Sequence, residues 1–332
     1  MKHDVLFLCP EDYHDLYYPT SAKIVYVSTL YSWLPGFLCN KITRDFFGLL
    51  SLFVALLRHA RSGDVILANR DLTAFPTRLI ALWRRAAGCY YIQAYEPDFY
   101  EFSNSLLRAA ARHISAASYR LHLRRIVNAP IYRNYREIVA DWVVPPGLNL
   151  TIFHPKEIEG ASQAQTPGKP WIVGCIGRAQ AWKGTGDIVA AVQILRGKGH
   201  DIELHVAFHL ADEFKCHDWI RHHQPHGDDK LACFYRSCDV FIAAGKIQYG
   251  GFHYPAAEAL ASGTILVGSP YFPANNENAY IFEECLPENI ALALEEALRD
   301  DEHRHRTKTA EGLRSVASLS WKDAASRFLT CL

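Results

Sequence analysis

The sequence lacks any hydrophobic run long enough to cross a bilayer. Its longest nearly apolar segment, FFGLLSLFVALL at 46–57, has 12 residues, whereas a transmembrane helix needs about 20. The opening stretch, MKHDVLFLC, has too short an apolar run for a signal peptide. Low-complexity stretches are also missing, and 49% hydrophobic residues can build sizeable cores. We therefore expect a soluble, globular protein of the cytoplasm.

The nine cysteines form no framework that would indicate disulfides or zinc. Cys233 and Cys238 are close in sequence, but no second closely spaced pair accompanies them. The formal net charge is zero, yet the first 150 residues hold five more basic than acidic residues. A basic first half suits an anionic surface or substrate. The sequence predicts no metal, no cofactor and no nucleic-acid partner.

Short apolar strands alternate with helical segments along the chain. In the first half we expect strands at 5–9, 64–70, 89–95 and 141–147, and helices at 21–33, 44–61, 73–88 and 103–126. In the second half we expect strands at 171–177, 202–208, 239–245 and 264–269, and helices at 185–199 and 255–263. This alternation predicts an α/β fold with parallel, doubly wound sheets.

The length of 332 residues predicts two domains, because a single core rarely keeps growing to that size. Residues 148–170 interrupt the alternation with proline, glycine and small polar residues, so we place a linker there. The expected domains are 1–147 and 171–318, followed by a helix within 319–332. Two such domains on one linker predict a ligand in the cleft between them.

One short helix is expected to begin without a cap. In GGFHYPAAEALASG, 250–263, Pro255 fits the first turn and Gly263 the stop, but Tyr254 is a poor N-cap. Uncapped amides at a helix start bind anions. Glu258, one turn further on, is placed to accept hydrogen bonds from the vicinal hydroxyls of a ribose. A glutamate that simply favours a helix start is the alternative.

Two cations follow the strand of GCIGRAQAWKG, 174–184. Gly177 allows a close approach of the backbone, Arg178 comes next, and Lys183 precedes a helix. Considered alone, Arg178 and Lys183 are more readily interpreted as solvated residues of a loop. Cations at the carboxyl end of a strand also suit a diphosphate. Together with the open helix start and Glu258, they describe a nucleoside diphosphate site.

The second half of the chain resembles the GT-B glycosyltransferases, in particular the retaining family 4. Five segments carry the resemblance, in the order of the family: VVPPGLNLTIFHP, GRAQAWKG, LACFYRSCDVFIAAG, GGFHYPAAEALASGTILVGS and LSWKDAASRFL. It covers about 145–332, whereas the first half agrees only in layout. The resemblance implies two Rossmann-like domains, of which 1–147 serves the acceptor and 171–318 binds the nucleotide sugar, with the last helix packing back on the first.

The resemblance also implies roles for individual residues. Arg178 and Lys183 would hold the donor diphosphate, and Glu258 the ribose hydroxyls. The full donor-binding set is Gly177, Arg178, Lys183, Gly251, Phe252, His253, Tyr254 and Glu258. One position departs from the family, because the glutamate expected eight residues before Glu258 falls on Gly250. That glutamate normally contacts the donor sugar, so the departure leaves the sugar's identity open.

The stretch AYEPDFY, 94–100, is the best candidate contribution of the first half. It follows an expected strand, which places Tyr95, Glu96 and Asp98 at the carboxyl end of the sheet. A carboxylate there could orient or deprotonate an acceptor hydroxyl, so Glu96 and Asp98 are the candidate catalytic residues. Turn residues around Pro97 are an equally good interpretation.

Further acceptor-side candidates are Tyr95, Asn69 and Arg70, since the last two end the preceding strand. The longer stretch IQAYEPDFY, 92–100, resembles a branch of bacterial rhamnosyltransferases of surface-polysaccharide synthesis.

Two other clusters have a plain interpretation. The histidines of HDWIRHHQPHGDD, 217–229, have no metal-ligand spacing and resemble a solvated loop. The basic residues of 108–125 fit the solvated face of a packed helix, although they leave peripheral membrane attachment open.

The sequence thus predicts transfer of a hexosyl group from a nucleotide diphosphate sugar to a hydroxyl of a glycan or lipid-linked acceptor, with retention. The alternatives are a sugar-nucleotide epimerase or an inverting transferase on the same fold, and a non-catalytic nucleotide-sugar-binding module.

Overall fold

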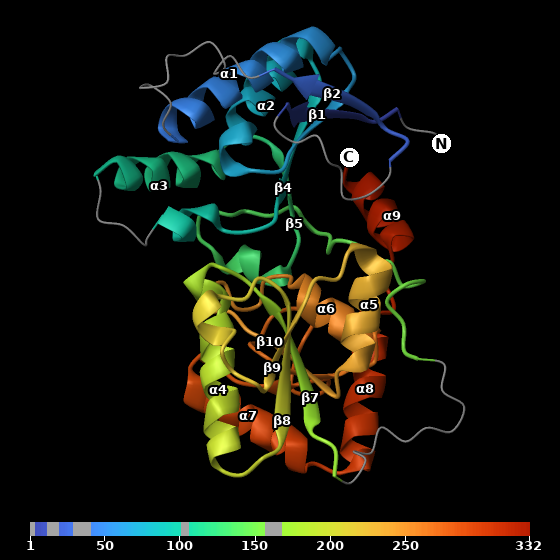
Figure 1. Cartoon of the computed structure of the whole chain (residues 1–332). Helices are drawn as coiled ribbons and strands as arrows, with labels where there is room; N and C mark the ends of the chain where they lie inside the picture. Colours follow the sequence, from blue (N-terminus) through green and yellow to red (C-terminus); the bar gives the residue numbers. More distant parts are fainter. Residues whose placement is uncertain (1–3, 12–19, 29–40, 101–105, 157–167) are drawn as a thin grey trace. The chain divides into compact units, whose positions relative to one another are not determined.

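The computed structural model describes residues 4–11, 20–28, 41–100, 106–156 and 168–332 (Figure 1). The chain forms two compact units. The first contains Met1–Asn128, Tyr132–Val143 and Thr330–Leu332, and the second contains Ala129–Ile131 and Val144–Leu329. Among the described residues no helix is both long and apolar enough to cross a membrane.

The first unit contains two parallel sheets. β1 (Leu6–Pro10) pairs with β2 (Lys23–Val27). The second sheet has the order β3 (Val65–Ala68), β4 (Ala87–Ile92), β5 (Arg124–Val127) and β6 (Trp142–Val143). The helices are α1 (Lys41–His59), α2 (Asp71–Arg84) and α3 (Leu106–Ser118), and the 3₁₀ turns are η3 (Glu96–Tyr100) and η4 (Pro130–Asn134).

Two of the expected helices in this unit are wrong in part. Lys23–Val27, expected within a helix at 21–33, is a strand, because its β-branched residues suit pairing with β1. The helix expected at 103–126 ends at Ser118, and Arg124–Val127 forms β5. Ile126 and Val127 are fully buried in the sheet, which is the packing that overrides the helical spacing of this stretch.

The second unit is built on one six-stranded parallel sheet. Its strand order is β12 (Tyr280–Ile281), β11 (Ile265–Gly268), β10 (Val240–Ala243), β7 (Trp171–Gly177), β8 (Ile202–Phe208) and β9 (Ile220–His223). The order reverses at β7, so the loop after β7 lies at a switch point of the topology. The α/β fold with parallel sheets in two domains, expected from the sequence, is confirmed.

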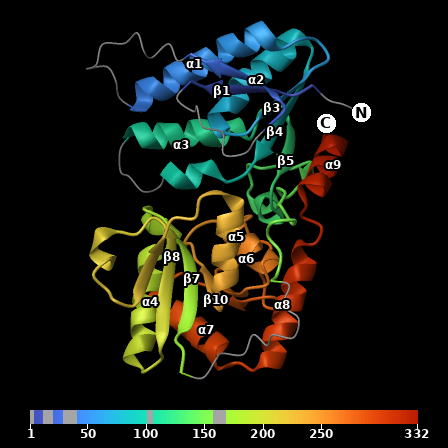
Figure 2. The ribbon, with the colours of Figure 1, turned by 45° about the vertical axis from the view of Figure 1, so that its right-hand side comes forward.

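Helices cover both faces of this sheet (Figure 2). α4 (Thr185–Gly197) and α7 (Pro287–Arg299) enclose one core with the strands. α5 (Gly227–Ser237), α6 (Tyr254–Ala261) and α8 (Glu302–Val316) lie on the other face. The 3₁₀ turns η5 (Ala181–Lys183) and η6 (Asp212–Phe214) complete the unit, together with the last helix, α9 (Trp321–Cys331), as far as Leu329. Strands buried on both faces explain the continuous apolar runs in the sequence.

Part of the expected linker packs inside the second unit. Leu148 and Phe153 are buried in the core under α5 and α6. Leu148 also pairs with Ser320 in a parallel bridge at the start of α9. Residues 157–167 of the expected linker lie outside the described residues.

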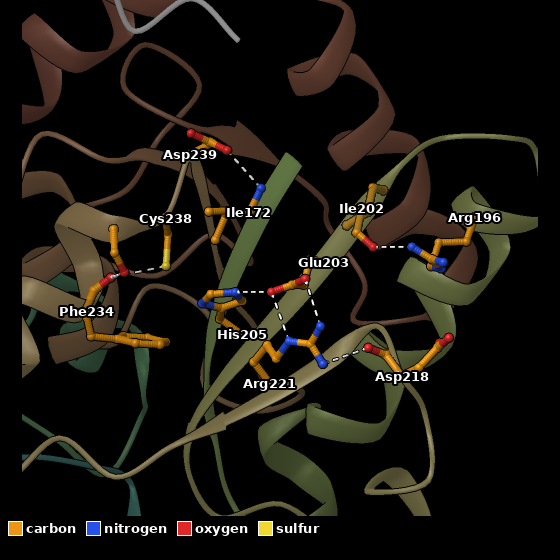
Figure 3. A network of polar contacts seen from close by, with 11 residues as sticks. Ile172, Arg196, Ile202, Glu203, His205, Asp218, Arg221, Phe234, Cys238 and Asp239 are labelled. Atoms are coloured by element: carbon orange, nitrogen blue, oxygen red, sulfur yellow. Dashed lines mark hydrogen bonds and ion pairs between the residues drawn. The ribbon is translucent and has the colours of Figure 1, made fainter. Parts of the chain in front are cut away.

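The expected loop of histidines is wrong in its centre, because Ile220–His223 forms the edge strand β9 (Figure 3). Glu203 holds this edge through its carboxylate, 2.9 Å from Nε2 of His205 and 3.2 Å from Nε of Arg221. The rings of His205 and His223 stack with centroids 4.7 Å apart. Polar residues can form this strand because an edge exposes part of its surface. No group of three or more ligands for a metal ion occurs among the described residues.

Candidate functional site

A tight crossing fixes the loop that follows β7. A Cβ on Gly177 would overlap the carbonyl oxygen of His209, so only glycine fits at the strand's end. The next residue is held by the start of α4: the backbone N–H of Arg178 donates to Oγ1 of Thr185 at 2.9 Å. The Thr185 hydroxyl in turn donates to the carbonyl of Arg178 at 3.2 Å. The loop therefore presents Arg178 from a defined backbone.

Two cations lie together on this loop. The Arg178 guanidinium stands 5.6 Å from the centre of the Phe208 ring, and Lys183 ends η5. Partial desolvation, and then the charge of Arg178, lower the pKa of Lys183. Asp187, in the first turn of α4, is paired with Lys246 at 2.8 Å. The two loop cations therefore create a local positive potential. A bound anion would be stabilised by it.

The helix α6 begins beside these cations, and no side chain caps it. Its N-cap residue is His253, which makes no side-chain cap hydrogen bond, and Pro255 occupies the first turn. The His253 ring stacks on Tyr271 with centroids 4.8 Å apart. Burial, followed by the charges of Lys183 and Arg178, lowers the pKa of His253 to about 3. The imidazole is therefore neutral near pH 7. It carries no charge that would neutralise the partial positive charge at the start of α6.

Glu258 lies on α6, one turn from its start. Its Oε2 accepts a hydrogen bond from the Tyr235 hydroxyl at 2.7 Å. Burial raises the pKa of Glu258 to about 7, against the opposing effects of the Tyr235 hydrogen bond and Arg178. Tyr235 is fully buried on α5, so it fixes the carboxylate in one orientation. The Tyr235 hydroxyl thus orients one of the two carboxylate oxygens of Glu258.

The two loop cations and the start of α6 border one cavity of ≈ 230 Å³, whereas Glu258, Gly177 and Gly251 do not line it. The predicted site residues that line it are Arg178, Lys183, Phe252, His253 and Tyr254. Its apolar floor comes from the β7 and β10 ends and α4, through Ile176, Ile188, Ile242, Ala243 and Ala244. A second cavity of ≈ 180 Å³ also has Arg178 in its wall, with Thr185, His209 and Glu213. Arg178 therefore stands at the border of two hollows at the switch point of the sheet.

Gly250 and Gly251 form the turn that leads to α6. Gly250 has φ +86, and a Cβ there would lie 3.0 Å from Cβ of Ile131. A glutamate at this position would be strained, because L side chains rarely adopt this backbone. The backbone conformation at Gly250 therefore disfavours the glutamate that the family has at this position. Gly251 is buried, and its N–H donates to the carbonyl of Gln248 at 2.9 Å.

In the first unit, Glu96 points to the start of α2. Its Oε2 accepts from the backbone N–H of Asp71 at 2.5 Å and from the Tyr90 hydroxyl at 3.1 Å. Burial, and then the nearby Asp71 carboxylate, raise the pKa of Glu96 to about 7. Glu96 thus caps a helix 25 residues earlier in the chain, a role that the sequence did not indicate.

The other candidates of the first unit have mixed surroundings. Tyr95 is buried, with its ring centroid 5.6 Å from that of Tyr119 and 4.4 Å from that of Tyr135. Asn69 and Arg70 are exposed, and Arg70 is the N-cap residue of α2. Asp98 is partly buried in η3. The structure therefore makes Tyr95 a packing residue and leaves Asp98, Asn69 and Arg70 nearer the surface.

Several side chains that orient the site were not expected from the sequence: Thr185, Tyr235, Tyr271 and Asp71. Thr185 was detectable, since threonine commonly precedes or starts a helix. Tyr235 and Tyr271 carried no local signal, because each contacts a residue at least 18 positions away. Asp71 follows Arg70 directly, but its proximity to Glu96 depends on the packing of α2 against β4.

Stability of the first unit should depend on pH through Glu96. Its raised pKa means that the folded chain keeps a proton that the unfolded chain releases, so this contribution is full below the ordinary pKa of 4.5 and is lost as pH rises through about 7. Glu96→Gln removes the titration and keeps an oxygen for Asp71 N–H. We expect the stability of the variant, relative to the original chain, to rise by about 2–3 kcal/mol between pH 5 and pH 8.

Urea unfolding at the two pH values measures this difference. Glu11→Gln, which changes an exposed carboxylate of the same unit, is the matched control and should show no change with pH. A Glu96→Gln variant whose relative stability is the same at both pH values would contradict the burial of a titrating carboxyl.

The chain is similar to known glycosyltransferases. Residues 157–311 match the family of glycosyl transferases group 1. A curated relative, D-inositol 3-phosphate glycosyltransferase from Corynebacterium glutamicum (strain R), is 25% identical over 209 residues, and the match covers 56% of this chain and 49% of the relative. The match thus spans about half the length of that relative. The group 1 sequence pattern therefore belongs to the unit that holds the cations and α6.

Solved structures share the fold across nearly the whole chain. Sucrose-phosphate synthase from Thermosynechococcus elongatus superposes with a TM-score of 0.77 and 17% identity, over 98% of this chain and 87% of the synthase. Anabaena Alr3699/HepE, in complex with UDP-glucose, gives a TM-score of 0.64 and 13% identity over 93% and 84% of the two chains. These likenesses establish the two-domain α/β fold of the GT-B glycosyltransferase structures.

Proposed function

We propose that the chain is a glycosyltransferase that uses a nucleotide diphosphate sugar as its donor. The observation that carries this proposal is a single cavity bordered by Arg178, Lys183 and the uncapped start of α6. Two cations and helix amides would bind a diphosphate and stabilise the negative charge that develops as it departs. The group 1 sequence match over residues 157–311 supports the same reaction class.

Within this proposal, Glu258 binds the ribose. Its Oε1 would accept from the vicinal hydroxyls while Tyr235 orients Oε2. The neutral His253, Phe252 and Tyr254 would border the diphosphate and the donor sugar. Because Gly250 replaces the family's sugar-contacting glutamate, we propose a hexosyl donor whose recognition differs from the usual one. The UDP-glucose complex of Anabaena Alr3699/HepE and the resemblance to rhamnosyltransferases suggest which donors to try first.

We also propose that the acceptor is a hydroxyl of a glycan or a lipid-linked glycan, served by the first unit, with retention at the anomeric carbon. Of the two candidate carboxylates, Asp98 is favoured over Glu96, because Glu96 already accepts hydrogen bonds at the start of α2. The protein would act in the cytoplasm during glycan synthesis. No divalent ion is needed in this scheme, because Arg178, Lys183 and the α6 amides neutralise the leaving diphosphate.

A donor screen tests the reaction class. The full chain is incubated with UDP-, GDP-, dTDP- and ADP-sugars, and thermal shift identifies the nucleotide, because a ligand that binds only the folded state raises its stability. Release of the nucleoside diphosphate is then followed with acceptor glycolipids, with and without EDTA. Turnover that survives EDTA, with the anomeric configuration kept in the product, supports the proposal. Binding without turnover would favour the non-catalytic module, and an epimerised donor would favour the epimerase.

Donor binding should weaken as pH falls through the raised pKa of Glu258. With a pKa of about 7, this carboxyl is mostly ionised at pH 8 and mostly protonated at pH 6. An ionised acceptor binds ribose hydroxyls more strongly than a neutral one. We expect the dissociation constant of a nucleotide sugar to rise by up to about tenfold from pH 8 to pH 6, by calorimetry.

Glu258→Gln should bind weakly and with no such dependence on pH, whereas Glu288→Gln, which changes an exposed carboxylate of α7, should behave like the original chain. A nucleotide sugar is used because its diphosphate does not titrate in this range. A Glu258→Gln variant with the original affinity at pH 8 would remove Glu258 from the site.

A further inference from the structure

The helix α2 carries an apolar stripe on its solvent side. Leu79, Leu82 and Trp83 are 58%, 58% and 66% exposed, and Phe75, one turn before Leu79, is partly exposed. These positions follow the spacing i, i+4, i+7 and i+8, which places them along one face of a helix. We call them the α2 outer stripe.

The opposite face of α2 is already buried. Ala74, Thr77, Ile80 and Ala81 are at most 3% exposed, and Ile80 and Ala81 belong to the core that α2 shares with α1 and β3. A helix that is apolar on both faces is typical of one covered on both sides. The inner face is explained by the core of the unit, so the outer stripe is the part that needs a partner.

Basic side chains border the outer stripe. Arg78 lies on the same turn as Leu79, and Arg84 and Arg85 follow Trp83. The Arg84 guanidinium stands 4.9 Å from the centre of the Trp83 ring and donates to the carbonyl of Leu57 at 2.5 Å.

The acidic side chain within α2, Asp71, is 2% exposed at the other end of the helix. Asp64, in the loop that pairs with the end of α2, accepts from the backbone N–H of Arg61 at 2.8 Å. The charge beside the outer stripe is therefore predominantly positive.

We propose that the α2 outer stripe binds the surface of a bilayer that contains anionic lipids. Leucine and tryptophan side chains enter the boundary between headgroups and acyl chains, and flanking arginines bind anionic headgroups. A helix of 14 residues is roughly 21 Å long and presents a face of roughly 200 Å². A stable protein interface needs about 800 Å² on each partner, so the stripe suits a lipid surface better than a second copy of the chain.

The proposed membrane contact lies on α2, and not on the basic residues of 108–125. Arg124 and Arg125 lie in β5, where their guanidinium groups donate to the carbonyls of Leu332 and Tyr119. They are held by the first unit itself. On α2, where Leu57 holds Arg84 in the same way, exposed leucine and tryptophan still occur next to Arg78 and Arg85.

Vesicle co-sedimentation of the full chain tests the proposal, without any donor or acceptor. The probe is vesicles made of equal parts phosphatidylcholine and phosphatidylglycerol, compared with vesicles of phosphatidylcholine alone. We expect binding to the mixed vesicles, weaker binding to the neutral ones, and a fall with added salt. Leu79→Ser with Trp83→Ser should lower the partition coefficient at least tenfold, and Arg78→Gln about fivefold.

Leu292→Ser is the matched control, since Leu292 is 62% exposed on α7 of the other unit, and it should bind vesicles like the original chain. Circular dichroism and nucleotide-sugar affinity should be unchanged in all variants, which separates this proposal from the proposed reaction. Equal sedimentation of the double variant and the original chain, or none with mixed vesicles, would overturn it. A concentration-dependent dimer that the double variant abolishes would show that a second copy covers the stripe instead.

Discussion

A chain that carries both Arg178→Ala and Lys183→Ala is expected to lose between a hundredfold and ten-thousandfold in affinity for a nucleoside diphosphate. A charge-assisted hydrogen bond contributes about 1.5–3 kcal/mol, and both side chains line the same cavity. The effect should be large because the site holds few other charges. Asp187 already pairs with Lys246, and His253 stays neutral because its pKa is about 3.

The single variants should be informative as well. Burial, and then the charge of Arg178, lower the pKa of Lys183, so the two cations repel each other and Arg178→Ala relieves that repulsion. The two single losses therefore need not add up to the loss in the double variant. Calorimetry with UDP and GDP measures all three.

The matched control replaces two exposed arginines of α8, Arg306→Ala with Arg314→Ala, which carries the same change in net charge. This control distinguishes the loss of contacts made by Arg178 and Lys183 from a general effect of the lower net charge. If the double loop variant binds within threefold of the original chain, the diphosphate lies elsewhere and the proposed donor site is wrong.

The second large effect is expected at Gly177. A Cβ at this residue would overlap the carbonyl oxygen of His209 and approach Cγ1 of Val206 to 2.7 Å. The obstacle is backbone rather than a flexible side chain, so β7 and β8 must separate locally. We expect Gly177→Ala to lower the free energy of unfolding of the second unit by about 3–5 kcal/mol. The loop that carries Arg178 should shift as well, so donor affinity falls with stability.

Gly197→Ala provides the contrast, because nothing lies within 4 Å of the added Cβ at the exposed end of α4. There the substitution should be neutral or stabilise by up to about 1 kcal/mol. Urea denaturation of both variants gives the comparison. A Gly177→Ala chain as stable as the original would mean that the crossing of β7 and the His209 loop relaxes easily.

Local sequence was sufficient for the four inner strands of the sheet in the second unit, β11, β10, β7 and β8, and for the charged loop. The strand at Trp171–Gly177 and the start of α4 at Thr185 lie where the apolar run and the glycines predict them. Strands buried on both faces produce continuous apolar runs, and a helix start without a cap can be seen from the residues themselves. Such features depend on neighbours within a few positions, which is why sequence alone places them.

Short strands were harder to predict. Arg124–Val127 and Ile220–His223 have four residues each and mix charged with apolar side chains. Their state depends on pairing with β4 and β8, which is not recorded in the local side-chain pattern of the two strands themselves. Backbone pairing of this kind contributes stability that no local periodicity records.

The sequence by itself determined the α/β class, the two cations after β7 and the open start of α6, because each follows from residues adjacent in the chain. Only the tertiary structure decided the state of the carboxylates. Glu96 meets Asp71 and Tyr90, and Glu258 meets Tyr235. Burial raises the pKa of both glutamates to about 7. Desolvation is a property of everything packed around a group, so it arises when the chain folds and cannot be seen in the order of residues.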